Sequence, residues 1–340
     1  MAVTISVDQL TADTKELYLR TVEDQVHDRI PLVYKLKRMN RVNTVGGRKI
    51  TKPVRYAKNT QTQHYLKGAP LNSATESKRT AAKYPWALTQ TPIKYDVEDE
   101  IVNNGDEQIV DTIAEEIKAA QEDQMDTLSQ VFFGQYVTAG SVTDVDDIPD
   151  GSPLSINAAF YGADNTYGGA ATYGGITRSA VGDWWDGIMD DGVTANASTA
   201  VSFNHWDFMV DGCMKHRGSR KNLLAICGSA LYRKWKSLVR SKEREVDISG
   251  MMAKAGFASF SIDGVEIVLD DNCADNYFYM LDLSTWEWRI NPKRAFKVTP
   301  FKWQGEQNNG IDEYLARVLL AHNLVCWKPR NNYMATSMAA

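Results

Sequence analysis

Residues 104–133, NGDEQIVDTIAEEIKAAQEDQMDTLSQVFF, form the most regular stretch of the chain. Ile109, Ile113 and Ile117 begin an apolar stripe that recurs every three or four positions, which is the spacing of one face of an α-helix. The stretch predicts a helix of about 42 Å at 1.5 Å per residue, ended by Gly134. Its opposite face is acidic and carries Asp111, Glu115, Glu116, Glu122 and Asp123.

The net charge of -5 conceals two adjoining blocks of opposite sign. The stretch from Lys35 to Lys94 has fourteen Lys/Arg residues and one acid, a net charge of +13. The stretch from Tyr95 to Asp150 has sixteen Asp/Glu residues and one base, a net charge of -15. This separation indicates that the basic segment contacts an acidic surface. That surface can belong to the same fold, to another copy of the chain or to nucleic acid.

The basic block reads as extended chain rather than helix. Residues 48–66, RKITKPVRYAKNTQTQHYL, alternate roughly between apolar and basic positions, and residues 83–97, KYPWALTQTPIKYDV, resume the pattern after a polar interruption. We predict a two-stranded basic arm over 42–94. An isolated two-stranded ribbon is marginal in water, so the arm should lie on another surface. An ordinary surface hairpin is the alternative.

The rest of the chain predicts a mixture of helices and strands. A capped helix is expected at 12–28, and residues 135–182 read as loop with short strands. Residues 203–300 predict a compact α+β unit, whose strongest turn signal is Asp263-Gly264. Its helices are expected near 205–215 and 231–240, and its strands near 223–227, 260–269, 277–281, 286–290 and 295–300. Residues 311–326 predict a long strand, with a helix as the alternative.

The sequence contains no pattern that predicts catalysis, a metal site or a cofactor. None of the four cysteines forms a CxxC pair, and the five histidines form no HExxH motif. The acidic run DVDDIPD, residues 144–150, lacks the Gly and Glu of a calcium-binding loop. No stretch is apolar enough to span a membrane, and no signal peptide is visible at the N-terminus, so synthesis in the cytoplasm is expected.

Several phrases of the sequence, taken in order, resemble one family. They are RVNTVGGRKITKPVRY (41–56), NNGDEQIVDTIAEEIKAA (103–120), YGGITRS (173–179), the tryptophan pair at 184–185 and GSALYRKW (228–235). Together with the order of arm, long helix, mixed unit and final strand, they resemble the tailed-phage major capsid proteins of the Hong Kong 97 fold.

This resemblance implies an α+β fold in five parts. Residues 1–41 would be an N-terminal arm with a helix, and 42–94 the extended E-loop hairpin. Residues 95–189 would form the P-domain with its long spine helix and a connecting loop, and 190–300 the A-domain. Residues 301–340 would return a strand to the P-domain and end in a C-terminal tail.

The resemblance also implies a function in the virion. Such proteins assemble into pentamers and hexamers that form the icosahedral head shell around the double-stranded DNA of a tailed phage. A separate scaffolding protein, a portal, a decoration protein and non-specifically bound DNA would be the partners, besides further copies of the chain. An encapsulin-like protein nanocompartment is the alternative within the shell class. An enzyme with an unrecognised site and a DNA-binding protein that uses the arm are the alternatives outside it.

The contact that holds such a shell together is expected between copies of the chain. The E-loop residues expected to make it are Arg48, Lys49, Lys52, Arg55, Lys58, Lys67 and Trp86. The residues expected to receive them on the spine helix of the neighbour are Asp111, Glu115, Glu116, Glu122 and Asp123.

Overall fold

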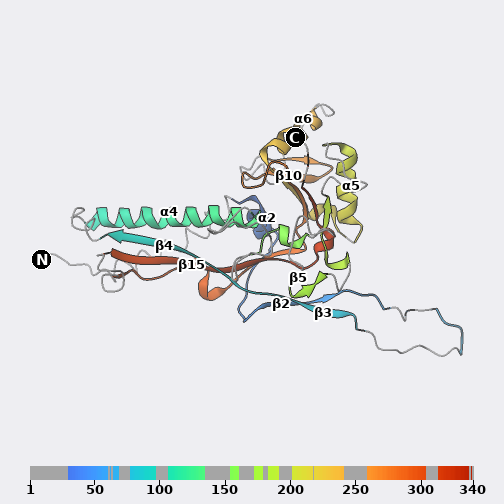
Figure 1. Cartoon of the computed structure of the whole chain (residues 1–340), viewed down its shortest axis with the longest axis horizontal. Coiled ribbons are helices and arrows are strands. Elements are labelled where there is room, and N and C mark those ends of the chain that lie inside the picture. Colours follow the sequence, from blue (N-terminus) through green and yellow to red (C-terminus); the bar gives the residue numbers. More distant parts are fainter. Residues whose placement is uncertain are drawn as a thin grey trace.

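The computed structural model describes most of the chain in separate ranges. The described residues are 30–59, 62, 64–68, 77–96, 106–134, 154–160, 172–178, 183–190, 201–216, 218–240, 259–303, 313–336 and 338. The helix expected at 12–28 and the acidic run at 144–150 lie outside them. The described parts form two sheets, a long helix and a projecting arm (Figure 1).

The first sheet is built around one long strand. β15, Glu313–Cys326, pairs antiparallel with four strands, and the order across the sheet is β1-β12-β15-β13, with β4 and β14 also beside β15. The other strands of the sheet are β1 (Val42–Thr44), β4 (Ala87–Asp96), β12 (Trp286–Ile290), β13 (Lys297–Val298) and β14 (Lys302–Trp303). The strand predicted over 311–326 is therefore confirmed, and the helical alternative is wrong.

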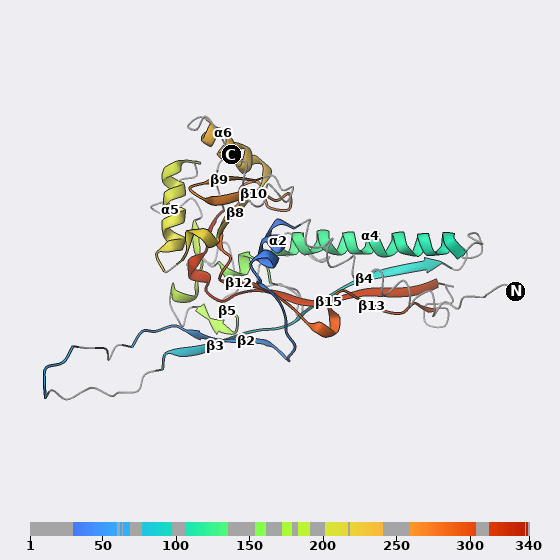
Figure 2. The ribbon, with the colours of Figure 1, turned by 180° about the vertical axis from the view of Figure 1, so that it is seen from behind.

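The predicted long helix is confirmed as α4, Asp106–Phe132, and it lies along β4 and β15 (Figures 1 and 2). Ile117 and Ala120 pack on Ile93 of β4 and on Ala316 and Val318 of β15. Alternation along β15 places Ala316 and Val318 on the face of the sheet that meets the helix. The apolar stripe of the sequence is thus the buried face of α4 in this part of the helix.

The second sheet carries two helices on one face. Its strand order is β7-β16-β11-β8-β10-β9. The strands are β7 (Ile188–Asp190), β8 (Leu223–Cys227), β9 (Ser259–Ile262), β10 (Val265–Leu269), β11 (Phe278–Asp282) and β16 (Tyr333–Ala335). The helices are α5 (Phe203–Met214) and α6 (Ser229–Arg240), which share one core cluster with the sheet, and Trp206 of α5 meets Trp235 of α6 edge to face. The hairpin at Asp263-Gly264 is confirmed, with both residues at positive φ.

Residues 190–300 do not form one self-contained unit. β12 and β13 join the first sheet, because the long strand β15 pairs with them. Conversely, β7 and β16 complete the edge of the second sheet, although they lie almost wholly outside 190–300. The strand expected over 295–300 is reduced to Lys297–Val298. The chain therefore crosses between the two sheets several times, and a large apolar cluster fills the space between them.

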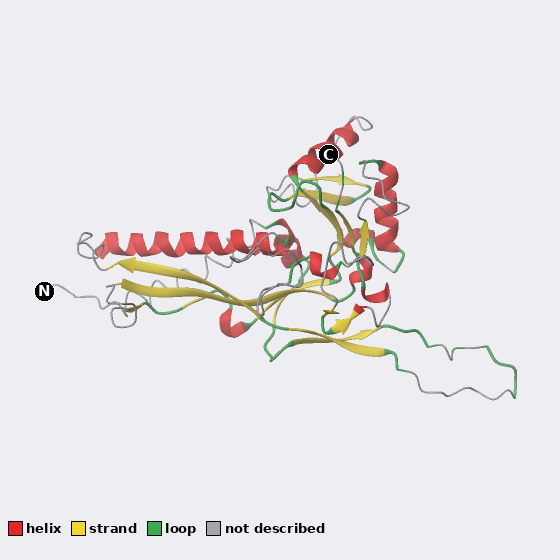
Figure 3. Ribbon diagram, in the orientation of Figure 1, coloured by secondary structure: helices red, strands yellow, loops and turns green. Residues whose placement is uncertain are grey.

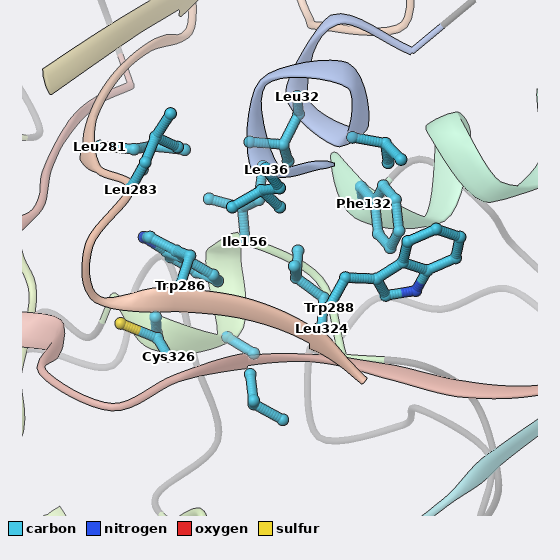
Figure 4. Close-up of a cluster of buried hydrophobic side chains, with 14 of the residues drawn as sticks. Leu32, Leu36, Phe132, Ile156, Leu281, Leu283, Trp286, Trp288, Leu324 and Cys326 are labelled. Atoms are coloured by element: carbon cyan, nitrogen blue, oxygen red, sulfur yellow. The ribbon is translucent and has the colours of Figure 1, made fainter. Parts of the chain in front are cut away.

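That cluster holds the two sheets and the short helix α2, Pro31–Arg38, together (Figure 4). Leu32 and Leu36 of α2 point into the cluster, on the side of Leu281, Leu283 and Ile156. Phe132 at the end of α4 meets Trp288 of β12 edge to face. Burial of these large apolar side chains, at roughly 1.5–3 kcal/mol each, stabilises the junction.

The arm is shorter than the sequence predicted. β2 (Ile50–Arg55) and β3 (Arg79–Tyr84) form a two-stranded antiparallel ribbon, whereas β1 and β4 belong to the first sheet (Figure 3). From here on the arm means residues 48–86, that is, the ribbon, the residues between its strands and two residues at each end. The small hairpin of β5 (Thr172–Tyr173) and β6 (Ile176–Thr177) lies beside its root.

Short 3-10 turns connect several of these elements. They are η2 (Asn157–Ala159), η4 (Asp183–Trp185), η5 (Arg220–Asn222), η6 (Pro292–Arg294) and η7 (Pro329–Asn331). Trp185 of η4 is buried, and its indole N–H donates to the carbonyl of Tyr173. Among the described helices, none combines the length and the apolar composition that crossing a membrane requires.

Candidate intersubunit surfaces

The ribbon has one face toward its own subunit and one toward solvent. Ile50, Ala82 and Tyr84 are buried, whereas Arg55 and Lys83 on the other face are exposed. This follows from the period of two along a strand, which separates even and odd positions. The outward face of the arm is therefore basic, and it is available to another molecule.

Most of the expected arm contacts lie in solvent. Arg48, Lys49, Arg55, Lys58 and Lys67 are exposed. Lys52 and Trp86 are half-buried and have partners in their own subunit. Lys52 lies on the same face of β2 as the buried Ile50, two residues before it, so it faces its own subunit. The indole N–H of Trp86 donates to the carbonyl of Gly47.

An ion-pair cluster receives Lys52 at the root of the arm. Its ammonium lies 3.2 Å from Oε1 of Glu287 in β12, and 4.8 Å from the ring centre of Trp327. Arg41 and Arg289 also pair with Glu287. Burial alone would raise the pKa of Glu287. The nearby indole of Trp327, hydrogen bonds from Arg289 and the charges of Lys52 and Arg289 together outweigh burial, so the pKa lies below its ordinary value.

A second set of contacts holds β3. The Tyr84 hydroxyl donates to the carbonyl of Cys326 at 2.7 Å, and the N–H of Cys326 donates to the Tyr173 hydroxyl at 3.0 Å. The Tyr84 ring meets the rings of Tyr173 and Trp327 edge to face. Burial raises the pKa of both phenols well above the ordinary value, so both hydroxyls keep their protons.

The acidic surface expected on the long helix is partly described. Glu116, Asp123 and Asp126 are exposed on α4, and Glu122 is half-buried. Asp111 and Glu115 belong to α4, but their side chains lie outside the described part. We call Glu116, Glu122, Asp123 and Asp126 the acidic helix face.

The basic arm and the helix α4, which carries the acidic helix face, extend to opposite sides of the subunit. The arm projects away from the body on one side, and α4 extends to the other side in both views (Figures 1 and 2). The charge blocks that adjoin in the sequence are separated because β4 runs back from the arm along the first sheet. This arrangement leaves the acidic helix face of another copy as the expected partner of the arm.

His322 and the four cysteines are buried titratable groups of the core. His322 accepts a hydrogen bond from Trp288, and burial lowers its pKa to about 3. Burial raises the pKa of the Cys326 thiol to about 12, and the other three thiols are also unpaired, buried and raised in pKa. Thiols of this kind are poor nucleophiles. No cluster of three or more His, Cys, Asp or Glu residues suited to a metal ion occurs among the described residues.

Sequence reasoning missed Glu287, Trp327 and Tyr173. Each meets the arm across a large separation along the chain, for example 235 residues between Lys52 and Glu287. The local signal at Glu287 is that an acid stands between two tryptophans, Trp286 and Trp288, in a strand that the structure buries. Its cationic partners could not be identified without the fold.

No protein-family model matches the chain. No curated protein matches it either.

Solved structures do match. The capsid asymmetric unit of cyanophage A-1(L) is similar with a TM-score of 0.60 at 13% identity, over 88% of this chain and 91% of that one. The capsid of a native GTA particle gives a TM-score of 0.54 at 11% identity, over 90% of each chain. The capsid of Myoviridae phage XM1 gives 0.50 at 11% identity, over 89% and 92%. The chain thus has an α+β, Hong Kong 97-like capsid fold, as the sequence resemblance implied.

Proposed function

We propose that this chain is the major capsid protein of a tailed double-stranded DNA phage. Copies would form pentamers and hexamers, and these would close an icosahedral head shell around the genome. The chain would act as a structural protein in the virion and would have no catalytic role. It would be made in the host cytoplasm before assembly.

One observation carries the proposal beyond the fold. A subunit exposes a basic arm that extends to one side and an acidic helix face on α4, which extends to the other side. Two surfaces that differ but complement each other make a heterologous contact. Such contacts generate closed rings when the rotation between copies closes, as pentamers and hexamers require.

Each ion pair of the proposed contact is weak, but a closed shell contains many copies of the contact. An exposed ion pair contributes roughly 0–1 kcal/mol, so the contact of Arg48, Lys49, Arg55, Lys58 and Lys67 with a neighbouring α4 is worth only a few kcal/mol. Repetition in a closed shell multiplies this term, because each copy is held on several sides. Weak pairs also let a wrongly placed subunit leave before closure.

Further partners complete the proposal. A scaffolding protein and a portal would direct assembly, a decoration protein would bind the finished shell, and DNA would contact it without sequence preference. Phosphates would bind exposed Lys and Arg side chains, so the contact with DNA would weaken as salt rises.

An encapsulin-like compartment is the second shell candidate, because a shared fold does not decide what a shell encloses. The contents of the particles separate the two proposals. Nucleic acid inside particles from infected cells supports the phage head, and a single enclosed protein supports the compartment.

Electron microscopy of the purified protein, with native mass spectrometry, tests the shell function. We expect capsomer rings or icosahedral particles, formed by the chain alone or with a co-expressed scaffold. A protein that remains monomeric at high concentration, with or without its neighbouring phage genes, would rule the function out.

A further inference from the structure

The arm divides into a supported root and a projecting outer part. Exposure along β2 and β3 changes from buried at Ile50 and Tyr84 to half-buried at Val54 and Thr80. The inward face of the ribbon is therefore packed on its own subunit along much of its length. Beyond it, the described residues 64–68 lie in the part that leaves the body (Figures 1 and 2).

The root is held on both of its strands at once. Tyr84 anchors β3 through its hydroxyl and its ring, and Lys52 anchors β2 through Glu287 and Trp327. Trp327 touches both anchors, which places them on a single support. We call Tyr173, Gly174, Glu287, Cys326 and Trp327 the arm socket.

Gly174 shows how closely the socket fits β3. Its carbonyl accepts the N–H of Lys83 at 2.7 Å, so the β5–β6 turn pairs with the ribbon. A Cβ built on Gly174 would lie 2.8 Å from the ring of Tyr84, and the backbone φ of +59° favours glycine. The turn can approach the ribbon this closely only without a side chain.

A third contact lies farther out. The ring of Tyr56 stacks on that of Trp184 in η4, with 5.4 Å between ring centres. Tyr56 follows the last residue of β2, and its hydroxyl donates to the carbonyl of Ser77 across the arm. The support therefore extends to the point where the paired strands end.

We infer that the arm socket fixes the direction of the arm within its own subunit, before a second copy binds, with Lys52 and Tyr84 as the positioning residues. The assembly role of that direction rests on the proposed function. Two anchors on adjacent strands restrain both the bending and the rotation of a ribbon that would otherwise be marginally stable. Ordering the arm during folding also removes an entropic cost from the binding of the neighbour.

Distances between two spin labels in unassembled subunits test the inference directly. The labels are placed on Arg79→Cys, exposed at the outer end of the ribbon, and Lys118→Cys, exposed on α4. The four native thiols are buried, so they leave the two introduced ones to react. We expect a narrow distance distribution in the otherwise unchanged chain and at least a twofold broader one in Lys52→Met and in Tyr84→Phe. Both substitutions keep most of the side-chain volume.

Lys58→Met is the matched control, because Lys58 is an exposed arm residue beyond the socket. It should leave the distribution narrow. A broad distribution in the chain with native Lys52 and Tyr84 would overturn the inference, and so would narrow distributions in both positioning variants. Neither result depends on whether shells form, so failure of the inference is distinguishable from failure of the proposed function.

Discussion

The ammonium of Lys52 in the arm lies 3.2 Å from the carboxylate of Glu287 in β12. This contact joins a ribbon that projects into solvent to the centre of the first sheet. Arg55 lies on the opposite face of β2 from Lys52, and both Arg55 and Lys49, which precedes β2, are exposed. The arm therefore has cations with two separate tasks: Lys52 holds it in place, and the outward cations are available to another copy.

Reversal of the outward charges should prevent assembly without unfolding the subunit. In a variant with Lys49→Glu, Arg55→Glu and Lys83→Glu, the arm would repel the acidic helix face of a neighbour. We expect unassembled subunits with a melting temperature close to that of the unchanged chain, and loss of particles by electron microscopy. Normal particles from this variant would contradict the proposed contact.

A compensating variant separates this contact from a general effect of charge. Adding Glu116→Lys and Asp123→Lys to the reversed arm restores opposite signs on the two surfaces. We expect particles to return at least in part, as counted by electron microscopy. If the helix substitutions restore nothing, the arm must meet a different surface of the neighbour.

Loss of the Glu287 carboxylate should cost stability in a pH-dependent way. The folded pKa of Glu287 lies below its ordinary value of 4.5, so its contribution is present above that pH and is lost as pH falls through the folded pKa. We expect Glu287→Gln to lower the free energy of unfolding by about 2 kcal/mol at pH 7, since it leaves three cations with a neutral partner. The difference between the two chains should narrow below about pH 4. Denaturant titrations at several pH values measure it, and an equal difference at all pH values would contradict the assignment.

The Asp270 carboxyl should make the folded chain less stable as pH rises, which is the opposite of the effect of Glu287. Burial raises the pKa of Asp270 from 3.8 to about 6, and the charge of Asp271 adds to the rise, whereas the hydrogen bond from the N–H of Asn272 and the nearby hydroxyl of Ser129 oppose it. The folded chain therefore binds this proton more tightly than the unfolded chain, so stability falls as pH rises between about 4 and 6. We expect Asp270→Asn to remove this slope and to raise the free energy of unfolding at pH 7 by up to about 3 kcal/mol. Denaturant titrations across this pH range measure the slope, and its persistence in the variant would refute the prediction.

Gly174→Ala should loosen β3, because the added Cβ meets the ring of Tyr84 and the positive φ strains an L-residue. We expect faster amide hydrogen exchange at Ala82 and Lys83. Gly46→Ala is the matched control, since nothing lies within 4 Å of its Cβ position. Equal exchange rates in the two variants would show that the turn does not support the ribbon.

Local pattern was enough to locate the main elements of this protein. The period of the apolar positions predicted α4 and the long strand β15 within a few residues, and Asp263-Gly264 located a hairpin. These features depend on neighbours a few positions apart, so the amino-acid order alone specifies them. The succession of the elements also carried the resemblance to the capsid fold.

The pairing of strands and the support of the arm, in contrast, could be known only from the folded chain. Ala87 of β4 pairs with His322 of β15, and Lys52 meets Glu287 at a separation of 235 residues. A hydrophobic period shows that a strand is buried, but it does not show its partner. For the same reason the sequence did not show that Lys52 faces inward. Which face of the ribbon is packed depends on the residues that it lies on, here Glu287 and Trp327.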